Sequence, residues 1–81
     1  MKIRVLYFAQ AREASGKNEE LLDLNGTTLK HLLEFIEKKN PKIKQVLKTC
    51  SLAINMQISR NKEDKLKEGD TVAILPPVAG G

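Results

Sequence analysis

The sequence predicts an α+β fold in which a mixed sheet packs on one long helix. Short segments with the composition or two-residue period of strands lie near both ends of the chain, and one apolar stripe with helical spacing lies between them. At 81 residues the chain is one domain, near the lower size limit for a self-sufficient core. Hydrophobic residues make up 41% and charged residues 30%, which is typical of a globular domain rather than a disordered chain.

The first two predicted strands lie at the N-terminal end. Residues 2–8 are rich in β-branched and aromatic residues, with Ile3, Val5 and Tyr7 on one face and Leu6 and Phe8 on the other. Apolar side chains on both faces indicate a central strand, or one whose second face meets a partner. A second strand follows at residues 20–24, with Leu22 and Leu24 facing inward, and Ser15-Gly16 marks a turn between them. A hairpin is therefore the expected connection.

The long helix is predicted by apolar residues at positions i, i+3, i+4 and i+7: Leu29, Leu32, Leu33 and Ile36. Thr27 or Thr28 can cap its start, and the run from Lys38 to Pro41 stops it, because proline cannot continue a helix. Similar spacing at Ile43, Val46 and Leu47 predicts a second, short helix.

The C-terminal part returns to a period of two. Leu52, Ile54, Met56 and Ile58 alternate with smaller or polar residues, which predicts a strand or a strand pair interrupted near Asn55-Met56. Residues 60–67 form a polar loop that Leu66 pins, and Gly69-Asp70 turns the chain into a last strand at residues 71–75.

A mixed sheet that folds around one long helix is the β-grasp arrangement. Its first and last strands lie parallel at the centre, because the intervening chain serves as the crossover. We therefore predict a β-grasp domain at residues 1–75 and an extended tail at residues 76–81. The last strand would anchor this tail.

The tail itself has unusual chemistry. Pro76 and Pro77 fix φ and lack an N–H, so they predict an extended exit from the sheet. Val78 and Ala79 lead to Gly80 and Gly81, which add no bulk, so a narrow channel could accept this end. A disordered terminus is the plain alternative. The functional hypothesis is that the Gly81 carboxylate is the reactive group.

No conventional active site is predicted from the side chains. His31 is expected on the helix surface, Cys50 as a half-buried apolar residue, and one Cys with one His cannot supply the usual zinc site. The Glu63-Asp64 pair is expected to be solvated. A basic run, Lys38, Lys39, Lys42, Lys44 and Lys48, is either a solvated face or a docking site for an acidic partner.

Composition also argues against nucleic-acid-binding and membrane-spanning classes of protein. With no Trp and three aromatics, the chain lacks the stacking platforms of single-strand nucleic-acid binders. No apolar run approaches membrane-spanning length, and a single cysteine favours the cytoplasm. We therefore expect a protein that binds neither nucleic acid nor membrane.

A terminal carboxylate becomes reactive only after activation. Its charge repels nucleophiles and oxide is a poor leaving group, but joining the carboxylate to AMP removes both obstacles. A sulfur nucleophile can then displace AMP to give a terminal thiocarboxylate. This sequence of steps needs no catalytic side chain on the carrier.

Two segments resemble one known family. Residues 6–13, with Phe8-Ala9 and Arg12-Glu13 followed by Gly16, resemble the N-terminal motif of the molybdopterin synthase small (sulfur-carrier) subunit. Residues 69–81 resemble its C-terminal motif even more closely. The resemblance runs the length of the chain and implies the ubiquitin-like β-grasp fold.

The resemblance also implies partners. An ATP-dependent adenylyltransferase similar to ubiquitin-activating enzymes would adenylylate Gly81, and a sulfur donor protein would supply the sulfur of the thiocarboxylate. The tail would enter the active site of the large subunit and donate sulfur to precursor Z (cyclic pyranopterin monophosphate), which forms the molybdopterin dithiolene. The chain itself would bind no cofactor or metal and would belong to a heterotetramer. Partner contacts are expected at Phe8, Arg12, Ile58, Leu75, Pro76, Pro77 and Val78.

Three alternatives remain open. A sulfur carrier for thiamine thiazole synthesis shares the fold and Gly-Gly end, although such carriers are typically shorter and lack both motifs. A ubiquitin-like protein modifier would join Gly81 to lysines of target proteins. An interaction domain with an inert tail would be unaffected by loss of Gly80 and Gly81.

Overall fold

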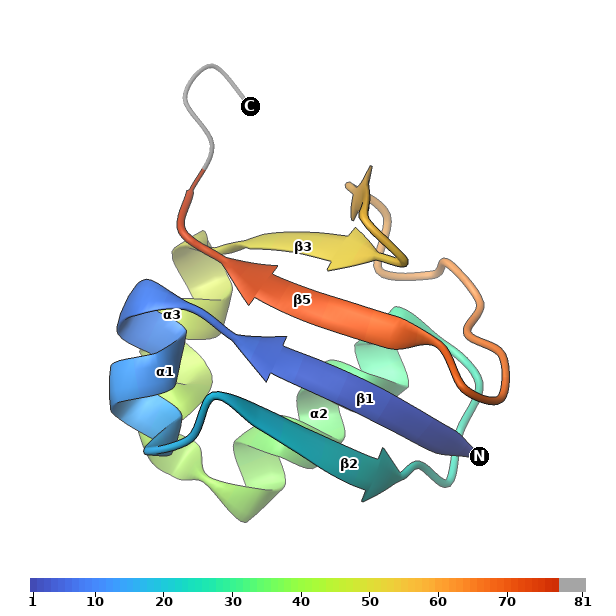
Figure 1. Cartoon of the computed structure of the whole chain (residues 1–81), viewed down its shortest axis with the longest axis horizontal. Coiled ribbons are helices and arrows are strands. Elements are labelled where there is room, and N and C mark those ends of the chain that lie inside the picture. Colours follow the sequence, from blue (N-terminus) through green and yellow to red (C-terminus); the bar gives the residue numbers. More distant parts are fainter. Residues whose placement is uncertain (78–81) are drawn as a thin grey trace.

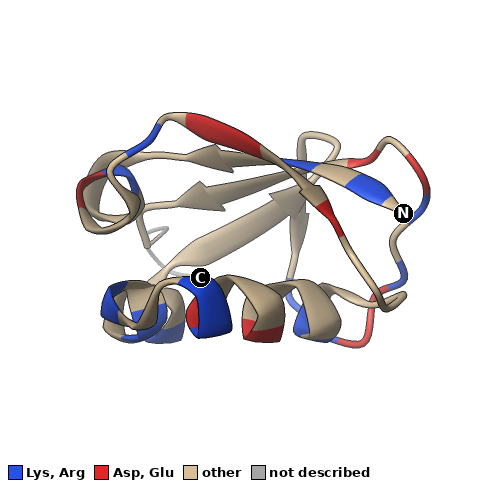
Figure 2. Cartoon of the chain, turned by 90° about the horizontal axis from the view of Figure 1, so that it is seen from below, with Lys and Arg blue, Asp and Glu red and all other residues tan. Residues whose placement is uncertain are grey.

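A five-stranded mixed sheet with helices on one face forms the domain (Figures 1 and 2). The computed structural model describes residues 1–77. Its elements are β1 (Lys2–Tyr7), α1 (Ala9–Ser15), β2 (Glu19–Asp23), α2 (Leu29–Lys39), the 3-10 turn η1 (Pro41–Ile43), α3 (Lys44–Thr49), β3 (Ser51–Ile54), β4 (Gln57–Ser59) and β5 (Thr71–Leu75). No helix in this part of the chain is long and apolar enough to cross a membrane.

The first and last strands lie side by side at the centre of the sheet. The strand order is β2-β1-β5-β3-β4, and β1 pairs with β5 in parallel, with Val5 opposite Val72. The other neighbours pair antiparallel. The predicted parallel centre is confirmed. Since β5 has a strand on each side, the point at which the chain leaves the sheet is firmly held.

The core lies between the sheet and α2. The apolar stripe of α2 is buried as predicted, and so are Leu22, Leu24 and Leu66. Seven large side chains are almost fully enclosed: Ile3, Val5, Leu29, Leu32, Ile43, Val72 and Ile74. Burial of these side chains supplies the main driving force for folding.

The start of α2 is capped by two side chains. Thr28 Oγ1 accepts a hydrogen bond from the His31 amide, as the sequence predicted for a capping threonine. In return, His31 Nδ1 accepts from the amides of Thr27 and Thr28 at 3.1 and 3.2 Å. His31 thus occupies the place that Glu or Gln takes in the usual capping box. The predicted surface position is confirmed, but this local role was not foreseen.

The prediction for the segment between β1 and β2 is wrong. A turn was expected, whereas residues 9–15 form α1, which buries Ala11 against the core. Seven residues are too few to show a repeated apolar stripe, so the periodicity carried no helical signal. The Ser15-Gly16 turn is confirmed, since Gly16 ends the helix in the left-handed region at φ 76°.

The predicted strand pair with an interruption near Asn55-Met56 is confirmed as the β3–β4 hairpin. Asn55 and Met56 form its turn, with φ 49° and 72°. Met56 is 98% exposed at this turn. Because the turn has two residues, Ile54 pairs with Gln57 and Ile58 pairs with Ala53. Ile58 therefore projects from the sheet face opposite to that of Leu52 and Ile54.

Candidate functional site

The tail leaves from β5, which is hydrogen-bonded to a strand on each side. Leu75, the last residue of β5, pairs with Ser51 of β3, and Pro76 and Pro77 follow in exposed positions. In Figure 1 the chain leaves the sheet at the end where α1 and α3 lie. The predicted site residues Val78, Gly80 and Gly81 lie outside the described residues.

An apolar surface lies on the sheet face away from the helices. Residues directly opposite one another in a ladder project from the same face. The register places these residues together on it: Leu6, Ala53, Ile58, Ala73 and Leu75, with Leu21 farther out on β2. We call this set, with Phe8, the outer apolar face. Phe8 is 41% and Ile58 46% exposed, and Leu21, on the edge strand opposite to that of Ile58, is 63% exposed. Exposed apolar side chains on one sheet face are typical of an interaction site.

Phe8 and Arg12 lie beside the start of the tail. Phe8 directly follows β1 and caps α1, and its amide donates a hydrogen bond to the Ile74 carbonyl at 3.1 Å. Ala9 then turns the chain sharply with φ 47°. Arg12 is exposed one helical turn after Phe8, so both side chains lie near the end of β5.

The tertiary structure thus brings together residues that are distant in sequence. Phe8 follows β1, Leu75 ends β5 and Ile58 lies in β4, and the three share the outer apolar face. Arg12, in α1, lies near its end. Leu21 was missed. Its place on an edge strand opposite Arg4, between Glu20 and Leu22, left only its alternation with the inward Leu22 as a signal.

A charged cluster around Glu20 lies on the helix side of the sheet. Glu20 accepts hydrogen bonds from Tyr7 Oη at 2.8 Å, Lys17 Nζ at 2.7 Å and Lys39 Nζ at 2.9 Å. Burial raises the pKa of Glu20, but the bonds from Lys17, Lys39 and Tyr7 outweigh it and hold this pKa at about 2. Burial, and then the Glu20 carboxylate, raise the pKa of Tyr7 far above its usual value. The cluster joins β1, β2 and α2 and is structural.

Cys50 occupies the half-buried position that the sequence predicts. Cys50 is half-buried and donates its S–H to the Leu47 carbonyl, with 3.6 Å between sulfur and oxygen. Burial raises the pKa of its thiol, which disfavours the nucleophilic thiolate. Within residues 1–77, no three His, Cys, Asp or Glu side chains gather closely enough to hold a metal ion.

One residue of the acid pair is half-buried, and one lysine of the exposed basic run forms an ion pair. Asp64 accepts a hydrogen bond from Ser59 Oγ at 2.6 Å and is half-buried, so the expected solvated position holds for Glu63 alone. Lys39 is engaged with Glu20. Figure 2 shows that cations and acids are interspersed along the helical side, so no single-sign face results there.

Comparison with known proteins gives a consistent result. A family model described as the ThiS family matches residues 5–81. A molybdopterin synthase sulfur carrier subunit from Chlamydomonas reinhardtii is 43% identical, and the alignment covers 100% of both chains.

Solved structures show the same fold. One chain of the complex of subunits 1 and 2 of molybdopterin-converting factor from Helicobacter pylori superposes with a TM-score of 0.74. Its identity to this chain is 30%, and the superposition covers 100% of both chains. The small archaeal modifier protein 1 from Methanosarcina acetivorans superposes with a TM-score of 0.84 at 30% identity, covering 99% of this chain and 96% of that one. The mixed sheet on one long helix is therefore the ubiquitin-like β-grasp fold.

Proposed function

This chain belongs to the ThiS family and is a relative of the molybdopterin synthase sulfur carrier subunits, and we propose that it is such a carrier. The observation that carries the proposal is the similarity over the full length, at 43% identity, to a protein of that name. The anchored β5 strand supports it, because a tail on a rigid support loses less conformational freedom when a partner binds it.

The proposed reaction takes place at the C-terminus. The Gly81 carboxylate attacks the α-phosphorus of ATP on an adenylyltransferase and releases pyrophosphate. A persulfide on a donor protein then attacks the acyl carbon and AMP leaves, and a thiolate cleaves the resulting acyl disulfide, which releases the thiocarboxylate and leaves a disulfide on the donor side. In the active site of the large subunit, this sulfur passes to precursor Z, and repeated transfer completes the dithiolene of molybdopterin.

The outer apolar face is the proposed docking surface for both enzymes. Phe8 and Ile58 supply exposed apolar area, the half-buried Leu75 lies at the start of the tail, and Arg12 adds a cation. Aromatic and arginine side chains of this kind often contribute most of the binding energy of an interface. Since each enzyme must seat the same tail, they would use this face in turn, with contacts extending along Pro76, Pro77 and Val78.

The direct test locates sulfur on Gly81. The protein is incubated with ATP, a sulfur donor and the cognate adenylyltransferase, and the C-terminal peptide is then fragmented in the mass spectrometer. Fragmentation is needed because exchange of oxygen for sulfur changes the mass almost as much as oxidation of Met1 or Met56, and Met56 is fully exposed. Sulfur on Gly81 supports the carrier, and an unmodified Gly81 under conditions that charge a known carrier opposes it.

A deletion provides the matched control. Removal of Gly81 takes away none of the buried residues, so the variant is expected to fold and to abolish sulfur transfer. A folded variant without Gly81 that still supports molybdopterin formation would rule out the proposed carrier chemistry.

A second function is favoured by one observation. The modifier protein from Methanosarcina acetivorans superposes closely on this chain, and attachment of Gly81 to lysines of target proteins uses the same acyl-adenylate. An antibody against the chain should then reveal ladders of heavier conjugates in cell extracts, which a pure carrier does not form.

A further inference from the structure

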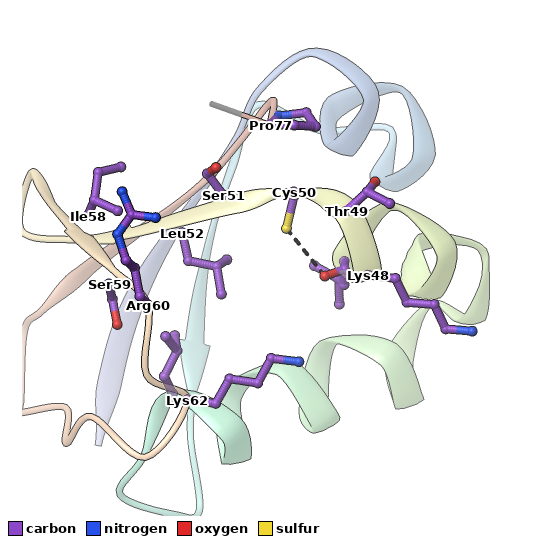
Figure 3. A pocket seen from close by; sticks show the side chains of 12 residues that line it. Lys48, Thr49, Cys50, Ser51, Leu52, Ile58, Ser59, Arg60, Lys62 and Pro77 are labelled. Atoms are coloured by element: carbon purple, nitrogen blue, oxygen red, sulfur yellow. Dashed lines mark hydrogen bonds between the residues drawn. The ribbon is translucent and has the colours of Figure 1, made fainter. Parts of the chain in front are cut away.

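A pocket of about 280 Å³ lies beside the start of the tail (Figure 3). It is bounded by the end of α3, the start of β3, and β4 with the loop after it. Leu29, Leu47 and Leu52 contribute apolar lining, while Lys48, Arg60 and Lys62 contribute cations. The pocket is therefore amphipathic.

No Asp or Glu lines this pocket, and among residues 1–77 the ion pairs involve none of its three cations. Lys48 and Lys62 also line an adjoining pocket that contains Glu34 and Glu37, whereas Arg60 does not. In Figure 3 the Lys62 side chain extends into the cavity, Arg60 lies beside Ile58, and Lys48 points away. Arg60 and Lys62 are thus the two charges available to an incoming group.

The pocket is continuous with the proposed docking surface. Ile58 belongs to the outer apolar face and also lines the pocket, and Pro77 lines it from the tail. A partner that covers Ile58 and holds the tail must therefore also close the pocket mouth. Closure removes water from Arg60 and Lys62, which is costly for any charge that is left without a counterion.

We propose that this pocket receives an Asp or Glu side chain from an enzyme that takes the tail, an inference that rests on the proposed function. The planar guanidinium of Arg60 can hold the carboxylate through two hydrogen bonds, and the Lys62 ammonium adds a second charge. The leucines accommodate the apolar stem of the acid. Such a contact, away from the reacting atoms, sets partner choice and association rate.

The test compares two variants with the same change of net charge. Arg60→Gln/Lys62→Gln removes the pocket cations, whereas Lys42→Gln/Lys44→Gln removes two exposed cations that do not line the pocket. For each variant, ATP–pyrophosphate exchange on the adenylyltransferase gives the KM for the carrier and kcat. Titration calorimetry gives the Kd for the large subunit. Both are measured at low and high salt.

For at least one of the two enzymes, the pocket variant is expected to raise KM or Kd at least about tenfold at low salt, with kcat unchanged. The control should change either value by less than about threefold, and the loss should shrink at high salt because screening weakens the pair. Equal losses in both variants would mean a general charge effect and overturn the proposal. An unchanged pocket variant with both enzymes would overturn it as well.

Two further outcomes separate this inference from its premise. If wild-type Gly81 is adenylylated but never acquires sulfur, the proposed function fails, and the exchange and binding assays still decide the pocket contact. If sulfur transfer is intact, only the pocket contact is under test. Titration of the free protein with inorganic phosphate, followed by amide NMR, detects a small-anion site instead. Saturable changes in amide chemical shift around Lys62, with a Kd for phosphate below about 1 mM, would indicate a small-anion site. This result would contradict a pocket that receives a protein side chain.

Discussion

The Phe8 amide donates a hydrogen bond to the Ile74 carbonyl at 3.1 Å, which joins the start of α1 to the strand that carries the tail. Tyr7 lies opposite Ile74 in the parallel ladder, so Phe8 continues that pairing to the end of the sheet. The exposed aromatic ring and the start of the tail are therefore held by neighbouring backbone positions. A partner that binds Phe8 therefore also lies beside the end of β5, where the tail begins.

Replacement of Phe8 tests the docking surface. Phe8→Ala should weaken binding to the large subunit by about 10- to 100-fold, because a central aromatic contact commonly contributes more than 1 kcal/mol. The free energy of unfolding should fall by less than about 1 kcal/mol, since Phe8 is 41% exposed. Titration calorimetry and urea unfolding measure the two effects.

Met56→Ala is the matched control for this prediction. Met56 is a large apolar side chain that is 98% exposed at the tip of the β3–β4 hairpin, away from the tail. The Met56→Ala variant should bind the large subunit as tightly as the wild type does. Equal loss of affinity in both variants would show that the apolar contacts are not concentrated at Phe8.

Glu20 should make stability depend on acid pH. Its pKa of about 2 lies below the ordinary value of 4.5, so its stabilising effect is complete above pH 4.5 and disappears as pH falls through 2. Glu20→Gln should therefore lower the free energy of unfolding by about 1–3 kcal/mol at pH 7. The difference from wild type should nearly vanish at pH 2, as measured by urea unfolding at several pH values.

The neighbouring Glu19 provides the comparison. Its ion pair with Arg4 joins side chains that are both more than half exposed, so Glu19→Gln should change stability by less than about 0.5 kcal/mol at any of these pH values. A pH-independent loss in Glu20→Gln would indicate a packing effect rather than a charge effect.

Asn55 holds the hairpin turn against the start of β5. Its Oδ1 accepts from the Thr71 amide and its Nδ2 donates to Asp70, both at 2.9 Å, while its backbone has φ 49°. Asn55→Gly keeps the left-handed backbone and loses the bonds, so it should cost about 1–2 kcal/mol. Asn55→Ala adds about 1 kcal/mol of backbone strain. A less stable glycine variant in thermal unfolding would contradict this order.

Gly26 should tolerate no side chain because of the His31 cap. A Cβ at Gly26 would lie 2.7 Å from His31 Cβ and 3.0 Å from Nδ1. The imidazole must then move and release the amides of Thr27 and Thr28, so Gly26→Ala should lower the free energy of unfolding by about 1–3 kcal/mol.

His31→Ala isolates the capping contribution and should cost less than Gly26→Ala, at about 0.5–2 kcal/mol. Chemical denaturation of both variants provides the comparison. If Gly26→Ala proves as stable as wild type, the close approach of His31 to Gly26 is not a constraint.

Local pattern predicted much of this fold. The stripe of α2, a threonine cap at its start and the buried Leu66 were anticipated, because each follows from spacing or from turn chemistry within a short window. The parallel central strands were anticipated from the order of the elements, because the chain between them serves as the crossover. Helix α1 was not, since a helix of seven residues shows too little of its period. His31 escaped notice as a cap because histidine rarely fills that place.

The candidate site divides in the same way. The resemblance of residues 6–13 and 69–81 to a known family implies contacts at Phe8, Arg12 and Leu75, and the prolines and glycines of the tail are visible along the chain. The outward direction of Ile58 depends on the two-residue turn at Asn55 and Met56, and the pocket beside Pro77 depends on three segments meeting. Such features arise from register and from contacts between distant residues, which no local pattern encodes, and for that reason they became visible only when the strands were paired.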